Sequence, residues 1–497
     1  MDNNDEVENN EDGHLDQMYT LDEALSVVGF GRFQVMVLCY AGLGSIAEAM
    51  EVMILSFVGP AVKSEWGLSS TQESLITTVV FAGMLVGAYS WGIISDYYGR
   101  RKGLVSVAVV TTISAFLSTF SPNYVTLIIL RMFVGVGLGG GPVYSSWFLE
   151  FVPAQKRGTW MVIFSTFWSV GTILEASLAW IIMPKLGWRW LLALSSIPSF
   201  AALIFYRFAT ESPRYLYMIG KISDVNNILR KMATVNQTDF PSGLLVSDEV
   251  PERDEEFAPV ERIGLLSSGS NKVSFFEAGI SSVIVLFSSR LLKTTLLLWV
   301  VYFGNAFAYY GIILLTSEMS SGQSECGSTS LNSKNSDDAS LYRDVFITSF
   351  AELPGLVLSA IIVDYIGRKR SMALLYFFSF IFLLPLLKHQ NEFLTTGLLF
   401  GARMCVIGTF TIAGIYCPEI YPTAVRTTGY GVASAVGRIG GMICPLVAVQ
   451  LVTGCHSVPA IVFFEVVIIL SGISVMLFPF ETKGRKLTDT VDVCSSS

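Results

Sequence analysis

Residues 92–102, GIISDYYGRRK, determine how this sequence is organised, because a similar stretch, AIIVDYIGRKR, occupies residues 360–370. Each stretch leaves an apolar run through an aspartate, makes a glycine turn and ends in three basic residues. Other markers recur in the same order about 270 residues apart: Arg131 and Arg403, Glu150 and Glu419, Arg157 and Arg426, Glu211 and Glu481. The repeat predicts two homologous halves of the same orientation, which is typical of two-bundle transporters.

The composition is that of a membrane protein. Of the 497 residues, 52% are hydrophobic and only 14% are charged, which excludes an ordinary soluble protein. Twelve apolar runs have the length of about 20 residues that is needed to cross a bilayer. They are centred near Cys39, Ala82, Thr112, Val136, Thr172, Pro198, Phe303, Ala351, Phe378, Ile407, Val436 and Ile468. We therefore predict an all-α membrane protein with twelve transmembrane helices.

Lysine and arginine in the connecting segments predict the orientation. They accumulate on the side that holds both termini, and this is the cytosolic side in membrane proteins. The acidic start of the chain is not a cleavable signal peptide, which would need a basic beginning and an early apolar core. The predicted organisation is an acidic disordered tail (1–24), a six-helix bundle (25–208), a cytoplasmic loop that begins with amphipathic helices (209–290), a second six-helix bundle (291–480) and a cytosolic tail (481–497).

The polar residues show no pattern that is typical of an enzyme. The sequence offers no nucleophile–base pair and no cluster of metal ligands, so we expect neither an enzyme nor a metal site. Nucleic acid is not an expected partner either. The three histidines, His14, His389 and His456, fall in the tail or in outer connections, so carboxylates must carry any proton inside the membrane.

These motifs resemble those of the major facilitator superfamily. ESPRYL (211–216) and FETKG (480–484) narrow the resemblance to its sugar-porter and organic-ion branches. GSIAEAMEVMILSF (44–57) is most similar to the synaptic-vesicle-related proteins and the plant organic cation/carnitine transporter 7 type, a branch also linked to nicotinate transport. The resemblance implies a secondary active transporter, monomeric, that moves a small organic ion across a bilayer by alternating access. It needs no cofactor beyond a proton gradient.

The resemblance also implies a cytoplasmic gate built from the repeated loops. Its predicted members are Asp96, Arg100, Glu150 and Arg157 in the first half, and Asp364, Arg368, Glu419 and Arg426 in the second. In the alternative interpretation, the basic loops only anchor the topology. The two aspartates are what this alternative does not explain.

Charges inside the apolar runs are the candidates for proton coupling. A charge at the bilayer centre costs roughly 2.5–3.5 kcal/mol and therefore faces a cavity or a partner. Glu48 and Glu51, three residues apart, are expected on one face of the first helix. Pairing of either with Arg131 would be similar to the acid–arginine pair of family symporters, and Glu175 is a further candidate. A purely structural salt bridge is the alternative for each.

Substrate charge is predicted from Arg438, in the eleventh apolar run. The resemblance places it where organic-anion members of the branch carry arginine and cation members carry aspartate. Trp168, Asn305, Tyr309 and Tyr310 are expected to line the cavity beside it. Arg438 would repel a simple cation, so we expect the substrate to carry a carboxylate. The candidates are a carnitine-like zwitterion/organic cation and a carboxylate such as nicotinate. Two alternatives remain: Arg438 pairs with Glu352 or Glu175 and meets no substrate, or the protein is a sensor or vesicle protein that does not transport.

Two cysteines, Cys326 and Cys455, fall on the predicted non-cytosolic side. A disulfide between them is possible in an oxidising compartment. The plasma membrane is the favoured location, with a vacuolar or vesicle membrane as the alternative.

Overall fold

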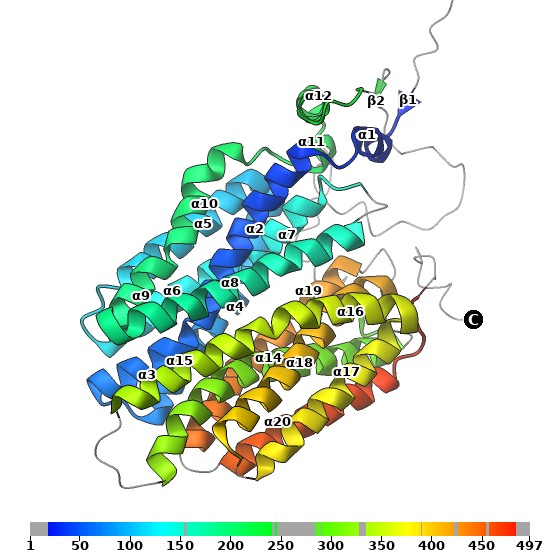
Figure 1. Ribbon diagram of the computed structural model, residues 1–497. Helices are drawn as coiled ribbons and strands as arrows, with labels where there is room; N and C mark the ends of the chain where they lie inside the picture. The colour runs from blue at the N-terminus through cyan, green and yellow to red at the C-terminus, as the bar shows by residue number, and fades with distance from the viewer. Residues whose placement is uncertain are drawn as a thin grey trace, which may run out of the picture.

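Two helical bundles lie side by side in the computed structural model (Figure 1). The structure describes residues 18–153, 157–240, 244–245, 284, 286–289, 291–327, 334–388, 390–421, 426–453 and 457–483. Only the backbone is described at positions 18, 96–97, 157–158, 244, 320–327, 334–340, 364, 426–428, 450–453 and 457.

Each bundle contributes six membrane-spanning segments, so the predicted twelve are confirmed. The first bundle contains α2 (Arg32–Met53) continued by α3 (Leu55–Trp66), α4 (Ser70–Tyr98), α5 (Arg100–Ser118), α6 (Tyr124–Leu138) continued by α7 (Gly141–Leu149), α8 (Arg157–Leu186), and α9 (Trp188–Ser195) continued by α10 (Ile197–Ile204) and η2 (Phe205–Phe208). The second contains α14 (Leu292–Gly327), α15 (Lys334–Phe350) continued by α16 (Glu352–Ile366), α17 (Arg368–Leu383) with η4 (Leu384–Leu387), α18 (Glu392–Ile420), α19 (Arg426–Thr453) and α20 (Ser457–Met476).

Prolines explain three of the breaks within spans. Proline has no N–H, so it cannot bond the carbonyl four residues earlier, and its ring clashes there. Pro142 follows the end of α6 by four residues, Pro198 follows Leu194 near the end of α9, and Pro354 follows Phe350 at the end of α15. New helix N-termini therefore arise inside the membrane, where they favour a nearby carboxylate.

Glycines allow the second and fourth spans to touch backbone to backbone. A methyl group on Gly87 would collide with the Val136 carbonyl, and one on Gly135 would collide with the Val80 carbonyl. Small residues of this kind are common where membrane helices approach closely. The glycine-rich run that begins at Val134 is therefore a packing surface for α4.

Short elements cover one end of the first bundle. They are β1 (Met18–Tyr19), which pairs in parallel with β2 (Leu244–Leu245), and the helices α1 (Leu21–Val28), α11 (Pro213–Met218) and α12 (Ile222–Asn236). Residues 18–24, which the sequence assigned to the disordered tail, are thus structured. Leu21, Ala24 and Leu25 are buried against α12 and its neighbours, and this burial is the reason for the correction.

The two halves meet through α4 with α19, α8 with α15, and α3 with α14. Phe57 and Tyr342 lie 5.9 Å apart between ring centroids, and Trp180 and Phe346 lie 5.2 Å apart. In Figure 1, α3 and α15 lie together at one end of the bundles. Several of the contacts between the halves are therefore aromatic packing at that end.

Candidate functional site

Glu48 on α2 and Arg438 on α19 face each other across the boundary between the two halves. Their carboxylate and guanidinium approach to 3.7 Å, and the side chains keep 12% and 16% exposure. Arg438 also donates a hydrogen bond of 3.4 Å to the Tyr310 hydroxyl. Arg438 therefore pairs with Glu48, and not with Glu352 or Glu175 as the alternative interpretation expected.

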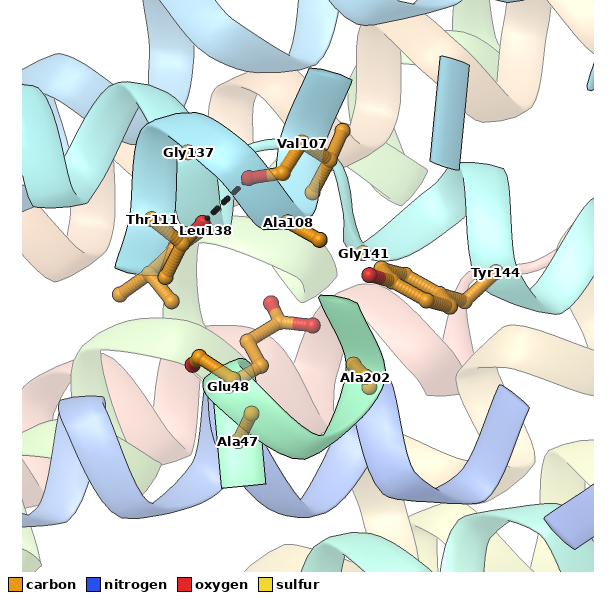
Figure 2. Close-up of a pocket in the computed structure, with 12 residues that line it drawn as sticks. Ala47, Glu48, Val107, Ala108, Thr111, Gly137, Leu138, Gly141, Tyr144 and Ala202 are labelled. Carbon is orange, nitrogen blue, oxygen red and sulfur yellow. Dashed lines mark hydrogen bonds between the residues drawn. The ribbon is translucent and has the colours of Figure 1, made fainter. Parts of the chain in front are cut away.

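Glu48 borders a pocket inside the first half (Figure 2). Its carboxylate points into the space between α2, α5, the α6–α7 break and α10, and the Tyr144 hydroxyl points toward the same space. A methyl group on Gly141 would overlap the Glu48 carboxylate, so the first turn of α7 lies directly against this acid. The N-terminus of α7 favours a negative charge there.

Glu51 pairs with Arg131 on α6. The two side chains are 0% and 1% exposed, and their charged atoms are 2.9 Å apart. Helix positions three residues apart differ in direction by about 60°. Glu48 and Glu51 therefore turn to different partners, and of the two acids only Glu51 reaches Arg131 among the ion pairs of the described chain.

Glu175 on α8 lies near this pair without bonding it. Its carboxylate accepts a hydrogen bond of 2.7 Å from the Ser195 hydroxyl and is fully buried. It is close enough to interact electrostatically with both Glu51 and Arg131. Two acids thus share the neighbourhood of one guanidinium.

The second half has its own buried pair, Glu352 on α16 with Arg403 on α18. Arg403 donates to one Glu352 oxygen through Nη2 (2.7 Å) and Nε (3.2 Å), and both side chains are 0% exposed. The Tyr309 hydroxyl donates to the same oxygen at 2.6 Å. Sequence reasoning did not make this pair a site, although Arg403 is the repeat counterpart of Arg131 and Glu352 opens a helix two residues before Pro354.

The predicted cavity aromatics separate into two groups. The Trp168 indole N–H, on α8, donates to the Tyr309 hydroxyl at 2.8 Å, so Trp168 and Tyr309 join the Glu352–Arg403 pair. Tyr310 lies with Arg438 instead.

Asn305 is not a wall of the space at Arg438. Its oxygen accepts hydrogen bonds from Tyr376 (2.6 Å) and Thr409 (2.8 Å) inside the second half, and its side chain is buried. The α17 and α18 hydroxyls thus occupy the Asn305 oxygen, and a role of Asn305 in substrate binding stays a prediction.

The loop residues form equivalent clusters in the two halves. Arg100 donates to Glu150 at 3.0 Å, and Arg368 donates to Glu419 through Nε and Nη2, both at 3.1 Å. Burial raises the pKa of Glu150, and the Arg100 charge opposes this shift. The side chains of Asp96, Arg157, Asp364 and Arg426 lie outside the part of the chain that is described, as do those of Cys326 and Cys455.

Glu211 and Glu481 complete these clusters and were only repeat markers in the sequence. Glu211 accepts from the Arg101 backbone N–H at 3.2 Å, and Glu481 accepts from that of Arg368 at 2.7 Å. The preceding glycines, Gly99 and Gly367, have φ of 101° and 95°, which other residues rarely adopt. Each glutamate therefore caps the helix that starts after a glycine turn.

Known proteins resemble this chain over most of its length. The family model described as sugar (and other) transporter matches residues 40–263 and 384–492. The chain is 59% identical over 483 residues to organic cation/carnitine transporter 7 of Arabidopsis thaliana, covering 95% of this chain and 96% of that protein. It is 35% identical over 485 residues to synaptic vesicle 2-related protein of Xenopus laevis, covering 96% and 83%.

The fold matches solved structures. The xylose transporter XylE from E. coli, in a partially occluded inward open conformation, aligns with a TM-score of 0.66 at 17% identity, covering 92% of this chain and 100% of that one. At this identity the likeness concerns the fold alone. Together with the family match and the sequence relatives, it shows that the chain belongs to the sugar (and other) transporter family of the major facilitator superfamily and is a membrane transporter, not an enzyme.

Proposed function

We propose that the protein is a proton-coupled secondary transporter, working as a monomer by alternating access, for a small organic ion that carries a carboxylate. The observation that supports this most directly is the partial exposure of Glu48 and Arg438, at 12% and 16%. The Glu51–Arg131 and Glu352–Arg403 pairs are at most 1% exposed. Of these three ion pairs in the described chain, Glu48–Arg438 is therefore the most accessible.

A zwitterion suits this pair. At 3.7 Å the Glu48 carboxylate and the Arg438 guanidinium attract each other but lie beyond hydrogen-bond distance, so the pair is loosely held. The planar guanidinium of Arg438 can bind a carboxylate through two hydrogen bonds, and the negative charge of Glu48 can pair with an ammonium group. A carnitine-like molecule would therefore replace one loose contact by two charge-matched contacts, one to each half.

A carboxylate without a cationic group, such as nicotinate, would use Arg438 and the Tyr310 ring. A simple organic cation would have to draw Glu48 away and leave Arg438 without a counter-charge, which is costly in a partly desolvated site. The relative named organic cation/carnitine transporter 7 supports the carnitine-like zwitterion among these substrate classes. We place the transporter in the plasma membrane.

Proton coupling rests on the first-half acids. Glu51 and Glu175 lie near a single guanidinium, Arg131, so the cluster is neutral when one of the two acids holds a proton. A buried site of this charge balance suits proton uptake and release as its surroundings change.

The alternative function is a sensor or vesicle protein that binds without transporting. The match to synaptic vesicle 2-related protein favours it. It predicts binding of a ligand at Glu48 and Arg438 without accumulation.

The test is uptake of labelled carnitine, nicotinate and tetraethylammonium into proteoliposomes, with and without an inward proton gradient. We expect gradient-driven uptake of at least one carboxylate and its loss in Arg438→Met. Binding without uptake would favour the sensor. Efficient tetraethylammonium uptake that carboxylates do not inhibit would overturn the substrate proposal.

A further inference from the structure

The pocket next to Glu48 lies within the first half and is separate from the boundary at Arg438. It is lined by residues of α2, α5, α6, α7 and α10, many of them glycine or alanine, which leave space beside the acid (Figure 2). Glu48 therefore stands between two environments. Arg438 of the other half lies on one side, and this pocket lies on the other.

The pocket holds hydrogen-bonding capacity that the protein does not use. The Ser199 hydroxyl on α10 lines it, is only 3% exposed and has no hydrogen-bond partner within the described chain. The Thr111 hydroxyl on α5 donates to the Val107 carbonyl at 2.9 Å and keeps its acceptor sites. Buried polar groups are normally satisfied, and an exception of this kind indicates bound water or an ion.

Size limits what the pocket can hold. Its volume is about 20 Å³. A cavity needs roughly 10–15 Å³ to hold one water molecule, so one or two waters fit and a quaternary ammonium group does not. The pocket is thus no subsite for the cationic end of a zwitterionic substrate.

The charges around Glu48 differ between its two sides. Arg438 on α19 and the Tyr310 hydroxyl on α14 lie toward the other half. The Tyr144 hydroxyl on α7 and the hydroxyls of Thr111 and Ser199 lie around the pocket and are neutral. The N-terminus of α7 also lies against Glu48 on this side and favours its ionised form, but with only about half of the charge that Arg438 carries. Glu51, three residues along α2, is turned to Arg131. A guanidinium suits an ionised carboxylate, whereas neutral hydroxyls and water suit a protonated carboxyl, which must donate its proton to an acceptor.

We infer that the pocket is a water site that receives the protonated carboxyl of Glu48. A hydronium ion transfers its proton to a Glu48 oxygen and becomes water, and the neutral carboxyl donates to pocket water that is held by Ser199 and Thr111. The attraction to Arg438 is lost, and Arg438 becomes free to take the substrate carboxylate as its counter-ion. This inference rests on the proposed carboxylate substrate, and it makes Ser199 a positioning residue for proton-linked binding.

The test measures nicotinate and carnitine binding to the purified full-length protein as a function of pH. We expect wild-type binding of nicotinate, which has no ammonium group, to tighten as pH falls and binding to Glu48→Gln to lose this dependence. Carnitine binding should not tighten, because its ammonium group pairs with ionised Glu48. Ser199→Ala removes one hydrogen bond to the protonated state. It should lower the apparent proton affinity about fivefold, the usual effect of one such bond.

Two controls isolate the pocket. Ser196→Ala removes a nearby hydroxyl that donates to the Ala193 carbonyl at 2.7 Å outside the pocket lining, and it should leave the pH profile unchanged. Ser199→Ala should have no effect on the profile in the Glu48→Gln background. An equal shift in both backgrounds, no shift in Ser199→Ala, or tightening by sodium in place of protons would overturn the inference.

A readout without substrate separates this inference from the proposed function. Infrared difference spectra on acidification should contain the C=O stretch of a protonated carboxyl that is absent in Glu48→Gln and shifted in Ser199→Ala. If neither ligand binds at any pH but this band behaves as expected, the substrate proposal fails and the pocket inference holds. If ligands bind but the band is unaffected by Ser199→Ala, the pocket inference fails alone.

Discussion

The two halves repeat their loop clusters and differ in their membrane charges. Arg100–Glu150 with Glu211 in the first half matches Arg368–Glu419 with Glu481 in the second. In the membrane, however, Arg131 pairs with an acid on the first span, whereas Arg403 pairs with an acid on the second span of its own half. The loop clusters are therefore equivalent in the two halves, whereas the buried acids lie on different spans.

The surroundings of the two buried pairs also differ. Arg131 has a second acid, Glu175, within electrostatic reach. The Glu352–Arg403 pair is instead bonded to Tyr309, which Trp168 of the first half contacts. The first pair has an additional carboxylate, that of Glu175, nearby, and this arrangement suits proton exchange. The second pair is connected by hydrogen bonds through Tyr309 to Trp168 of the other half, so it can respond to the position of that half.

The largest expected effect is the loss of an acid from the second-half pair. Glu352→Gln leaves Arg403 buried, and a guanidinium cannot lose its proton. Breaking a buried pair in this way costs about 3–5 kcal/mol in the free energy of unfolding. Glu51→Gln should cost clearly less, because Glu175 remains near Arg131. Denaturant unfolding of the purified variants measures both.

A matched control is the double variant Glu352→Met with Arg403→Met, which removes both charges and should recover most of the lost stability. Equal losses for Glu352→Gln and Glu51→Gln would contradict the idea that Glu175 supplies spare charge in the first half.

A smaller effect is expected from the link between the halves. Trp168→Phe keeps an aromatic ring but removes the N–H donor to Tyr309, which is worth about 0.5–1.5 kcal/mol. Because this bond joins the halves, its loss should shift the balance of conformations toward separation of α8 from α14 by about fivefold. Distances between spin labels on α3 and α15 report that balance.

Tyr309→Phe separates the two roles of this link, because it also removes the hydrogen bond to the ionised Glu352. It should lower the unfolding free energy by about 1.5–3 kcal/mol in addition to shifting the conformations. If Trp168→Phe lowers stability but leaves the spin-label distances unchanged, the Trp168–Tyr309 hydrogen bond stabilises the fold without affecting the balance of conformations.

Much of the fold and of the loop clusters could be predicted from the sequence. The repeat spacing predicted that Glu419 is the counterpart of Glu150, and apolar runs predicted the twelve spans, because both features are encoded along the chain. The partners of Arg403 and Asn305 could not be predicted in this way. Which helix faces them depends on the packing of α14, α16, α17 and α18, and no spacing rule within one helix contains that information.

The pocket and the ordered residues 18–24 could not be predicted from the sequence either, because both depend on contacts between distant segments. Ser199 is an ordinary serine near a proline in sequence, and only the approach of α10 to α2 brings it to the space beside Glu48. Residues 18–24 are acidic in part, but Leu21 and Ala24 pack with apolar residues of α12, about 200 residues away in the sequence.

The smallest effect should distinguish the two loop clusters, which otherwise look alike. Glu150 is bonded to Arg100 by a single contact, and one of its buried oxygens has no hydrogen-bond partner within the described chain. Glu419 is bonded to Arg368 by two contacts and accepts a third hydrogen bond, of 2.6 Å, from Thr482. Glu419→Gln should therefore lower the unfolding free energy by about 1 kcal/mol, while Glu150→Gln should change it by less.

The sign of the Glu150 effect follows from its pKa, which burial raises in the folded protein. A carboxyl with a raised folded pKa favours folding most when it is protonated, and this contribution is lost as pH rises through the folded pKa. At neutral pH, Glu150→Gln should accordingly be neutral or slightly stabilising, and its difference from wild type should vanish in mild acid, where Glu150 takes up a proton. Unfolding measured from about pH 8 down to about pH 5 tests this. A loss for Glu150→Gln at neutral pH as large as that for Glu419→Gln would mean that Arg100, and not burial, dominates the first-half cluster, and that the two clusters are energetically as well as geometrically equivalent.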